Sequence, residues 1–210
     1  MGRQLGVSRT TVRTALQSLE QHGVVTRTPG RGTSVHERMS PPLVALQRLI
    51  GFADLIREQG FEVTYTPTLT VTQEPSAVVI EALGIEAGTA CYEIDRLLFA
   101  DGQPAVWAVD MFPLSSFNRE LDFTHATVPR SPFDIDPSLF IEPIDHAVVE
   151  ILPHRAGEDL VEKLGLEPTQ PCILLREVHY SEMGTALGFS AINVNDRFVR
   201  FELIRRREGL

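Results

Sequence analysis

The apolar positions near the start of the chain follow a helical spacing. Val12, Leu16 and Leu19 recur at i, i+4 and i+7, which predicts an amphipathic helix with one apolar face. Ser8 suits the N-cap of this helix and Gly23 its left-handed C-terminal position, so we expect a helix of about four turns between them. The opposite face is polar, and its side chains are Arg9, Thr10, Arg13, Thr14 and Gln17.

A second helix and a hairpin are predicted on either side of this segment. The stretch QLGVS reads as the end of a preceding helix that Gly6 closes in a tight turn. After the helix, VVTRT and TSV alternate like two short strands around residues 29–32, whose glycines permit a tight turn. This order predicts a helix-turn-helix followed by a hairpin, in which the second helix enters the DNA major groove. A solvated helix face or an ordinary turn is the alternative for any single residue.

A domain boundary is predicted at VHERMSPP, residues 35–42, because it combines polar residues with a Pro-Pro pair. We therefore expect a DNA-binding head over residues 1–38 and a larger body over residues 39–210. The body begins with an amphipathic helix that ends at Gly60, and its apolar stripe is Leu46, Leu49, Ile50, Ala53, Leu55 and Ile56.

Two segments of the body, residues 76–113 and 157–199, repeat one another. Each reads as a short helix, a strand, a glycine-containing turn and a second strand. Further strands are expected over residues 61–73, 144–152 and 197–207. These elements predict an α+β body with an antiparallel sheet and helices on one face, and a cleft between the pseudo-symmetric halves suits a small molecule. The aligned pairs include Leu83 with Leu164, Gly84 with Gly165, Cys91 with Cys172, and Phe99 with Tyr180.

Charge is distributed unevenly along the 210 residues, whose formal net charge is −9. Residues 1–39 contain six arginines and two glutamates, a net charge of +4, whereas the remainder carries −13. A basic head on an acidic body indicates that the head binds a polyanion, and chance clustering is the alternative. The chain has neither an 18-residue apolar run nor a secretion signal, so we expect a cytoplasmic protein with no membrane partner.

The head resembles the winged helix-turn-helix of GntR-type bacterial transcription regulators over residues 5–35, LGVSRTTVRTALQSLEQHGVVTRTPGRGTSV. Members of that family have a complete first helix and most of a second before the LGVS turn, whereas about one turn precedes it here. We therefore expect an N-terminally incomplete head, through a misassigned start codon, a truncation within a longer frame, or a genuinely shorter domain. The resemblance implies DNA-facing positions in the recognition helix at Ser8, Arg9, Thr10, Thr11 and Arg13, and in the wing at Arg27, Gly30, Arg31 and Gly32.

The body resembles the UTRA effector-sensing domain of the HutC subgroup of these regulators, which has a chorismate lyase-like fold. The segments that carry the resemblance are ALGIEAGTACYEIDRLLFADGQPAV, SPFDI and GFSAINVNDRFVRFEL. Phe133 and Phe189 replace tyrosines of the family, Leu98 replaces a second arginine of phosphosugar-sensing members, and Arg176-Glu177 inverts the usual order of acid and base. The effector-binding residues that the resemblance implies are Arg96, Ser131, Phe133, Ser190 and Arg197. A strand salt bridge to nearby acidic residues is the alternative for Arg96.

Catalytic signatures are missing from the sequence. It contains no GxSxG, HExxH, Walker or dinucleotide motif, its histidines form no HxH pair, and Asp134 to Asp136 suits a turn. Cys91 and Cys172 lack CxxC spacing and are expected to be buried thiols. The prediction is therefore a non-enzymatic transcription repressor with no metal or cofactor, acting as a homodimer on a double-stranded DNA operator under the control of a small effector. The alternatives are a stand-alone small-molecule-binding or lyase-like protein with a vestigial head, and an adaptor that binds an acidic protein.

Overall fold

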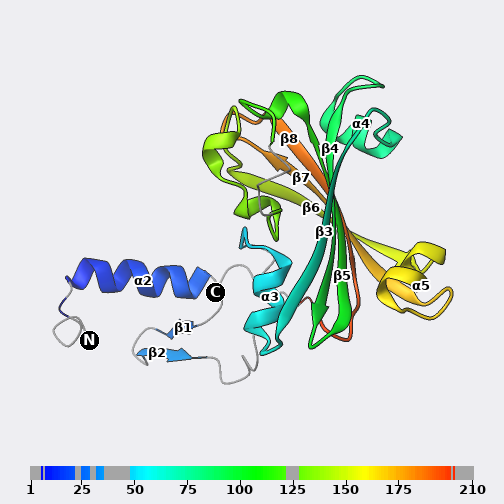
Figure 1. Ribbon diagram of the computed structural model, residues 1–210. Helices are drawn as coiled ribbons and strands as arrows, with labels where there is room; N and C mark the ends of the chain where they lie inside the picture. The colour runs from blue at the N-terminus through cyan, green and yellow to red at the C-terminus, as the bar shows by residue number, and fades with distance from the viewer. Residues whose placement is uncertain are drawn as a thin grey trace. The chain divides into compact units, whose positions relative to one another are not determined.

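The computed structural model describes residues 6, 8–21, 25–28, 32–35, 48–121, 128–199 and 201. The chain divides into two compact units (Figure 1). The small unit comprises residues 1–45 and 201–210, and the large unit comprises residues 46–200. Among the described residues, no helix is long and apolar enough to cross a membrane.

The small unit contains the helix and hairpin that the sequence predicts. Helix α2 spans Arg9–Gln21, and strands β1 (Val25–Thr28) and β2 (Gly32–Val35) pair antiparallel. The Ser8 hydroxyl accepts a hydrogen bond from the Thr11 backbone N–H at 3.1 Å, which confirms the predicted N-cap. Gly6 has a φ of +66°, as its turn position requires. The predicted helix before Gly6 lies outside the described residues.

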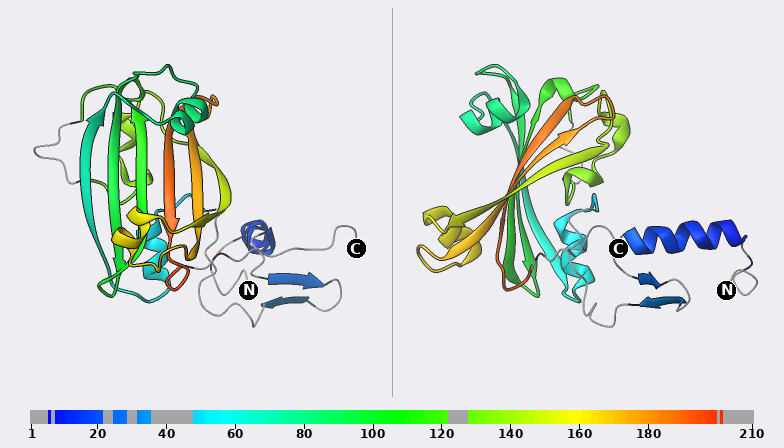
Figure 2. Two further views of the ribbon diagram at one scale, coloured as in Figure 1. Left: turned by 90° about the vertical axis from the view of Figure 1, so that its right-hand side faces the viewer. Right: turned by 180° about the vertical axis from the view of Figure 1, so that it is seen from behind.

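The large unit is built on one antiparallel sheet of six strands in the order β3-β4-β5-β8-β7-β6 (Figure 2). The predicted repeats are confirmed: α4-β4-β5 and α5-β7-β8 follow one another, and β5 pairs with β8 where the two halves meet. Helix α4 packs on β8 and α5 packs on β5, so each helix covers the other repeat. The strand bounds are β3 Val63–Thr72, β4 Cys91–Ala100, β5 Gln103–Pro113, β6 His146–Arg155, β7 Pro171–Tyr180 and β8 Ala186–Val194.

Both repeat helices end at a left-handed glycine, and α4 also begins after a capping serine. Helix α4 (Ala77–Leu83) follows Ser76, whose hydroxyl accepts from the Val79 N–H at 3.4 Å. It ends at Gly84 with a φ of +62°, and α5 (Glu158–Leu164) ends at Gly165 with a φ of +63°. Glycine adopts the left-handed conformation without steric cost, which explains why both repeats have a glycine at this position.

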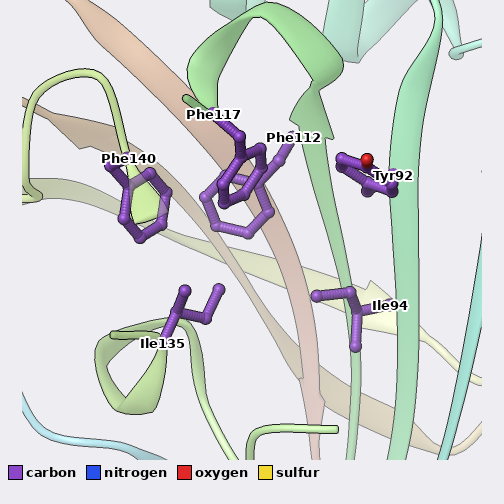
Figure 3. Close-up of a cluster of buried hydrophobic side chains, with 6 residues drawn as sticks. All are labelled: Tyr92, Ile94, Phe112, Phe117, Ile135 and Phe140. Atoms are coloured by element: carbon purple, nitrogen blue, oxygen red, sulfur yellow. The ribbon is translucent and has the colours of Figure 1, made fainter. Parts of the chain in front are cut away.

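Both faces of the sheet are covered, which corrects the expectation of helices on one face. Helices α4 and α5 lie on one side, and α3 (Phe52–Glu58) with the segment that follows β5 lies on the other (Figures 1 and 2). On that second side, aromatic rings from the sheet and from residues 114–140 form a buried cluster (Figure 3). Its members are Tyr92, Ile94, Phe112, Phe117, Ile135 and Phe140. The short 3₁₀ helices of this segment are η1 Leu114–Ser116, η2 Pro132–Asp134 and η3 Pro137–Leu139.

Helix α3 is shorter than the apolar pattern predicts. Arg48, Leu49 and Ile50 are not helical, and Leu49 is 40% exposed. The chain is extended at Gly51, where a Cβ atom would lie 2.5 Å from the Cβ of Ser131. Close packing of the two segments therefore separates the helix from the residues before it. The predicted final strand is also wrong over residues 197–198, which lie in a turn, and residues 202–207 lie outside the described part of the chain.

Candidate functional site

Five polar side chains lie buried on the sheet face that α3 covers. They come from four neighbouring strands, and the pairing aligns Asp110 of β5 with Ser190 of β8, and Ser190 with Glu177 of β7. Charged and polar groups are seldom fully buried unless they are paired or functional. We call this set the polar cluster, and its members are Arg96, Asp110, Glu177, His179 and Ser190.

Arg96 and Asp110 form an ion pair at the centre of the cluster. Arg96 Nη2 contacts Asp110 Oδ2, and the two side chains are 2% and 1% exposed. Burial lowers the pKa of Arg96 to about 10, and the nearby Asp134 acts in the opposite direction. The charge of Arg96 is thus retained and is balanced by Asp110. The salt-bridge alternative is correct in kind, although the partner is Asp110 and not the adjacent Asp95, which accepts from Trp107 at 2.9 Å.

A directed chain of hydrogen bonds extends from this pair to His179. The Ser190 hydroxyl donates to Asp110 Oδ1 at 2.5 Å, and His179 Nε2 lies 2.7 Å from Ser190 Oγ. A hydroxyl has one proton, so the Nε2–H of His179 must donate to Ser190. His179 Nδ1 has no hydrogen-bond partner within the described part of the chain. Burial and the charge of Arg96 lower the pKa of His179 to about 3, which keeps the ring neutral.

This arrangement differs from the catalytic triad of a serine hydrolase. In a triad, histidine lies between serine and aspartate and removes the serine proton, whereas here Ser190 lies between His179 and Asp110. Ser190 is also fully buried. These hydrogen bonds therefore hold Asp110 in place beside Arg96, and the Ser190 hydroxyl is not available as a nucleophile.

Glu177 is the member of the cluster whose charge is not balanced. Its side chain is buried, and its carboxylate has no hydrogen bond or ion pair to any described residue. Burial raises the pKa of Glu177 to about 7, because the charged form loses hydration without gaining a partner. An isolated buried carboxylate is costly, which makes this position a candidate for contact with a ligand.

Two adjacent cavities adjoin the cluster. The inner cavity has a volume of about 20 Å³, and Arg96, Asp110 and Ser131 line it. The outer cavity has a volume of about 220 Å³ and extends to Arg48, Asp145 and His146. About 10–15 Å³ of this kind of space accommodates one water, so the inner cavity holds a single small group. The residues that line both cavities are Phe52, Phe133 and Glu177.

Four of the five effector residues implied by the resemblance come together here. Arg96, Ser131 and Phe133 line the inner cavity, and Ser190 is bonded to Asp110 directly behind it. The Ser131 hydroxyl is buried and has no hydrogen-bond partner among the described residues. Arg197 lies elsewhere: it is exposed, and its guanidinium lies 5.4 Å from the ring centroid of Phe198.

Sequence reasoning missed Asp110, Glu177 and His179. For two of them the sequence did contain a sign: Glu177 and His179 alternate with Leu175 along one strand, so they share a face with this buried residue. A charged residue at an inward-facing strand position is unusual and could have marked the cluster. The two cysteines are buried and free, as expected.

A larger cavity of about 330 Å³ lies on the opposite face of the sheet, beside Trp107, His154 and Asn193. Its acidic residues, Glu158 and Asp159, are exposed, so it lacks the buried charges that distinguish the polar cluster. Within the described part of the chain, no group of three or more His, Cys, Asp or Glu side chains could hold a metal ion.

The start of α2 presents the predicted DNA-binding side chains to solvent. Arg9 and Arg13 are exposed and make no ion pair with any described carboxylate, while Val12 and Leu16 on the other face are half-buried. Gly32 is exposed in β2 with a φ of +95°. Gly30, Arg31 and the side chain of Arg27 lie outside the described part. The remaining exposed residues of the predicted set are Ser8, Thr10, Thr11, Thr14 and Gln17.

Comparison with protein families gives two matches. Residues 58–198 match the UTRA domain, and residues 1–35 match the family described as bacterial regulatory proteins, gntR family. Both matches agree with the resemblances drawn from the sequence.

The similar curated proteins are named as HTH-type transcriptional regulators. The chain is 35% identical over 120 residues to the uncharacterized HTH-type transcriptional regulator RB1450 of Rhizobium meliloti, which covers 55% of this chain and 47% of that protein. It is 28% identical over 188 residues to the HTH-type transcriptional repressor NagR of Bacillus subtilis, and this match covers 87% of this chain and 73% of that protein. The chain thus spans about half the length of the first relative.

Solved structures share the fold. The possible transcriptional regulator YydK of Bacillus subtilis superimposes with a TM-score of 0.69 at 21% identity, covering 97% of this chain and 86% of that one. PhnF from Mycobacterium smegmatis gives a TM-score of 0.64 at 19% identity, covering 99% and 89%.

Proposed function

The chain belongs to the GntR family of bacterial regulatory proteins and carries a UTRA domain, and from this premise we propose that it is a cytoplasmic repressor whose affinity for a DNA operator is set by a small molecule. The operator contacts are assigned to α2 and the β1-β2 hairpin, and the effector to the cavities beside the polar cluster. The name of the Bacillus subtilis relative, a transcriptional repressor, supports the assignment as a repressor.

The observation that carries the DNA-binding role is the exposed start of α2. Arg9 and Arg13 project from a capped helix and have no carboxylate partner among the described residues. Arginine can form paired hydrogen bonds with guanine, and serine or threonine hydroxyls contact phosphates or base edges. A hairpin follows the helix, as in a winged helix-turn-helix. The unbalanced positive charge of this region is suited to a polyanion.

The effector role rests on the inner and outer cavities. They bring Arg96, Ser131 and Glu177 together behind the aromatic side chains of Phe52 and Phe133. Concave sites with a few convergent polar groups are typical of small-molecule binding. Binding there would favour one conformation of the body, and couplings of this kind are typically worth about 1–3 kcal/mol. We assign no catalytic activity, because Ser190 is buried and is not activated by a histidine base.

The proposed organisation is a DNA-binding domain over residues 1–38 and an effector-binding and dimerisation domain over residues 39–210. As a homodimer, the protein would place two heads on the half-sites of a near-palindromic operator. The effector would alter how well the spacing of the heads suits those half-sites.

The test is DNA binding by the product of the full reading frame that contains these 210 residues. Fluorescence anisotropy would compare the affinity of the protein for DNA from upstream of its own gene with its affinity for a scrambled duplex, both at moderate salt. We expect specific binding that weakens as salt rises, because arginines displace counterions from DNA. Arg13→Ala should weaken binding and lower the salt dependence by about one counterion if it contacts phosphate.

Arg155→Ala is the matched control, because Arg155 is an exposed arginine of β6 in the large unit. It should leave operator affinity unchanged. Equal affinity for the upstream region and the scrambled duplex would contradict the proposed function, and so would an Arg13→Ala variant that binds as tightly as the wild type.

A further inference from the structure

The charges around the two cavities do not cancel. Arg48 is held by both oxygens of Glu58 at 2.9 Å, and Arg96 is held by Asp110. Arg130 lies 3.4 Å from Asp134 and 3.6 Å from Asp54. Each arginine that lines a cavity therefore has its own carboxylate, and the described residues provide no cation for Glu177.

Two further features reduce the positive charge near Glu177. His179 on the same strand is neutral, because burial lowers its pKa to about 3. Asp145 adds a second carboxylate to the outer cavity and lies 2.9 Å from His146. The outer cavity is thus lined by excess negative charge, and of its two carboxylates Glu177 is buried whereas Asp145 is exposed.

The other residues that line the outer cavity are apolar, five of them aliphatic and two aromatic. Phe52 and Phe133 line both cavities beside Glu177, and Phe133 packs edge-on against His179 with a centroid distance of 5.4 Å. Aromatic faces attract cations through their quadrupole. A buried carboxylate in a cavity that aromatic side chains also line is suited to an ammonium group.

We propose that the effector carries an ammonium group, which Glu177 binds at the junction of the inner and outer cavities. This inference rests on the proposed function and adds the chemical class of the ligand. The volume of about 220 Å³ is below the roughly 300–1,000 Å³ of sites for drug-sized ligands, so the ligand is a small metabolite. A hydroxyl or water-sized group would occupy the inner cavity against Ser131 and the Nε–H of Arg96, which both lack hydrogen-bond partners among the described residues.

The test uses two pairs of probes that differ in charge. Choline is compared with 3,3-dimethylbutan-1-ol, and 2-aminoethanol with ethane-1,2-diol, by following the melting temperature of the full chain at about pH 8, above the pKa of Glu177 of about 7. We expect the ammonium member of at least one pair to raise the melting temperature, and its neutral counterpart to bind about tenfold more weakly or worse.

Glu177→Gln should abolish this difference, because it keeps the shape of the side chain and removes its charge. Glu182→Gln, in the exposed β7-β8 turn, should retain it. In the wild type, ammonium binding should weaken as the pH falls below about 7, because Glu177 becomes protonated. This last measurement does not require Glu177→Gln to fold, and the pH dependence should persist in His146→Gln, which removes the imidazole that also lines the outer cavity.

Equal responses to the charged and neutral members of both pairs would overturn the proposal, as would an ammonium preference that survives in Glu177→Gln. Neither result depends on DNA. A loss of operator binding with an intact, Glu177-dependent ammonium response would instead remove the proposed function and leave the ligand site in place.

Discussion

Arg96 and Glu177 occupy the same position in the two structural repeats and carry opposite charges. Each lies five residues after the cysteine that begins the matching part of β4 or β7, Cys91 or Cys172. Arg96 is balanced by Asp110, whereas Glu177 has no partner among the described residues. The near-symmetric fold therefore has an asymmetric charge pattern, and this asymmetry gives the cavities their chemical preference.

The first prediction concerns stability and pH in Glu177→Gln. The pKa of Glu177 is raised from 4.5 to about 7 in the folded state. At this group the folded protein therefore binds more protons than the unfolded chain between these values, so Glu177 contributes a loss of stability as the pH rises through this window. Relative to the wild type, the glutamine variant should be similar near pH 4.5 and more stable above pH 7, by up to about 3 kcal/mol. Urea unfolding at several pH values measures the difference.

His179 contributes with the opposite sign, since its pKa is lowered from 6.5 to about 3. Its stabilising effect is present above pH 6.5 and is lost as the pH falls, so it should dominate the profile of Glu177→Gln. The other ionisable groups that line the cavities are unchanged in this variant, namely Arg48, Arg96, Asp110, Arg130, Asp145 and His146. Parallel profiles for wild type and variant would show that Glu177 has an ordinary pKa.

The second prediction tests the hydrogen bonds through Ser190. Ser190→Ala removes the acceptor of the His179 Nε2–H and the donor to Asp110. Both groups are buried, and an unsatisfied buried group costs about 1–3 kcal/mol. We expect a loss of stability in that range in urea, with the six-stranded sheet retained by circular dichroism.

Ser138→Ala is the control for Ser190→Ala, because Ser138 is exposed and Asp136 keeps the hydrogen bond from the Ser138 backbone N–H when the side-chain contact between these two surface residues is removed. It should change the free energy of unfolding by less than about 0.5 kcal/mol. If the two variants are equally stable, the Ser190 hydroxyl does not hold the cluster together.

The fold was predictable to the extent that local patterns determine it. The repeats were visible because glycines such as Gly84 and Gly165 recur with the same apolar spacing, and this spacing reflects backbone conformation and burial. The helix that follows Gly51 was predicted too long, because its start depends on the contact of Gly51 with Ser131, which lies far away in sequence. Periodicity contains no information about such a contact.

The candidate site was predictable only in part for a related reason. Arg96, Ser131 and Ser190 were found through resemblance, whereas the partnership of Arg96 with Asp110 depends on strand register and side-chain direction. Glu177 was notable in the sequence only because Arg176-Glu177 inverts the usual order of acid and base. Its importance comes from the absence of a counterion among the described residues, and a single sequence does not reveal which charges remain unpaired.

The third prediction concerns Gly51 and the wall of the inner cavity. A Cβ at Gly51 would lie 2.5 Å from Ser131 Cβ and 2.7 Å from Ser131 Oγ, closer than carbon atoms pack. Gly51→Ala should therefore displace the start of α3 from the segment that carries Phe133. We expect a loss of about 1–3 kcal/mol of stability through overpacking and a weaker response to the ammonium probes.

Ser131→Gly removes both clashing atoms and is the matched second substitution. If the clash causes the effect, the double variant should be more stable than the sum of the single changes predicts, with a coupling of about 0.5–3 kcal/mol. Additive changes in the unfolding free energy would show that the segments do not pack as described.

The last prediction separates the structural and DNA-binding roles of Ser8. Its hydroxyl caps α2 by accepting from the Thr11 N–H at 3.1 Å. Ser8→Ala removes this cap at a cost of about 1 kcal/mol, whereas Ser8→Asp retains an effective cap and adds a negative charge at the start of the helix. Ser8→Asp should therefore preserve helix content while lowering operator affinity, because the carboxylate would repel phosphates. Anisotropy titrations beside circular dichroism measure both effects, and undiminished operator binding by Ser8→Asp would place the helix start away from the DNA backbone.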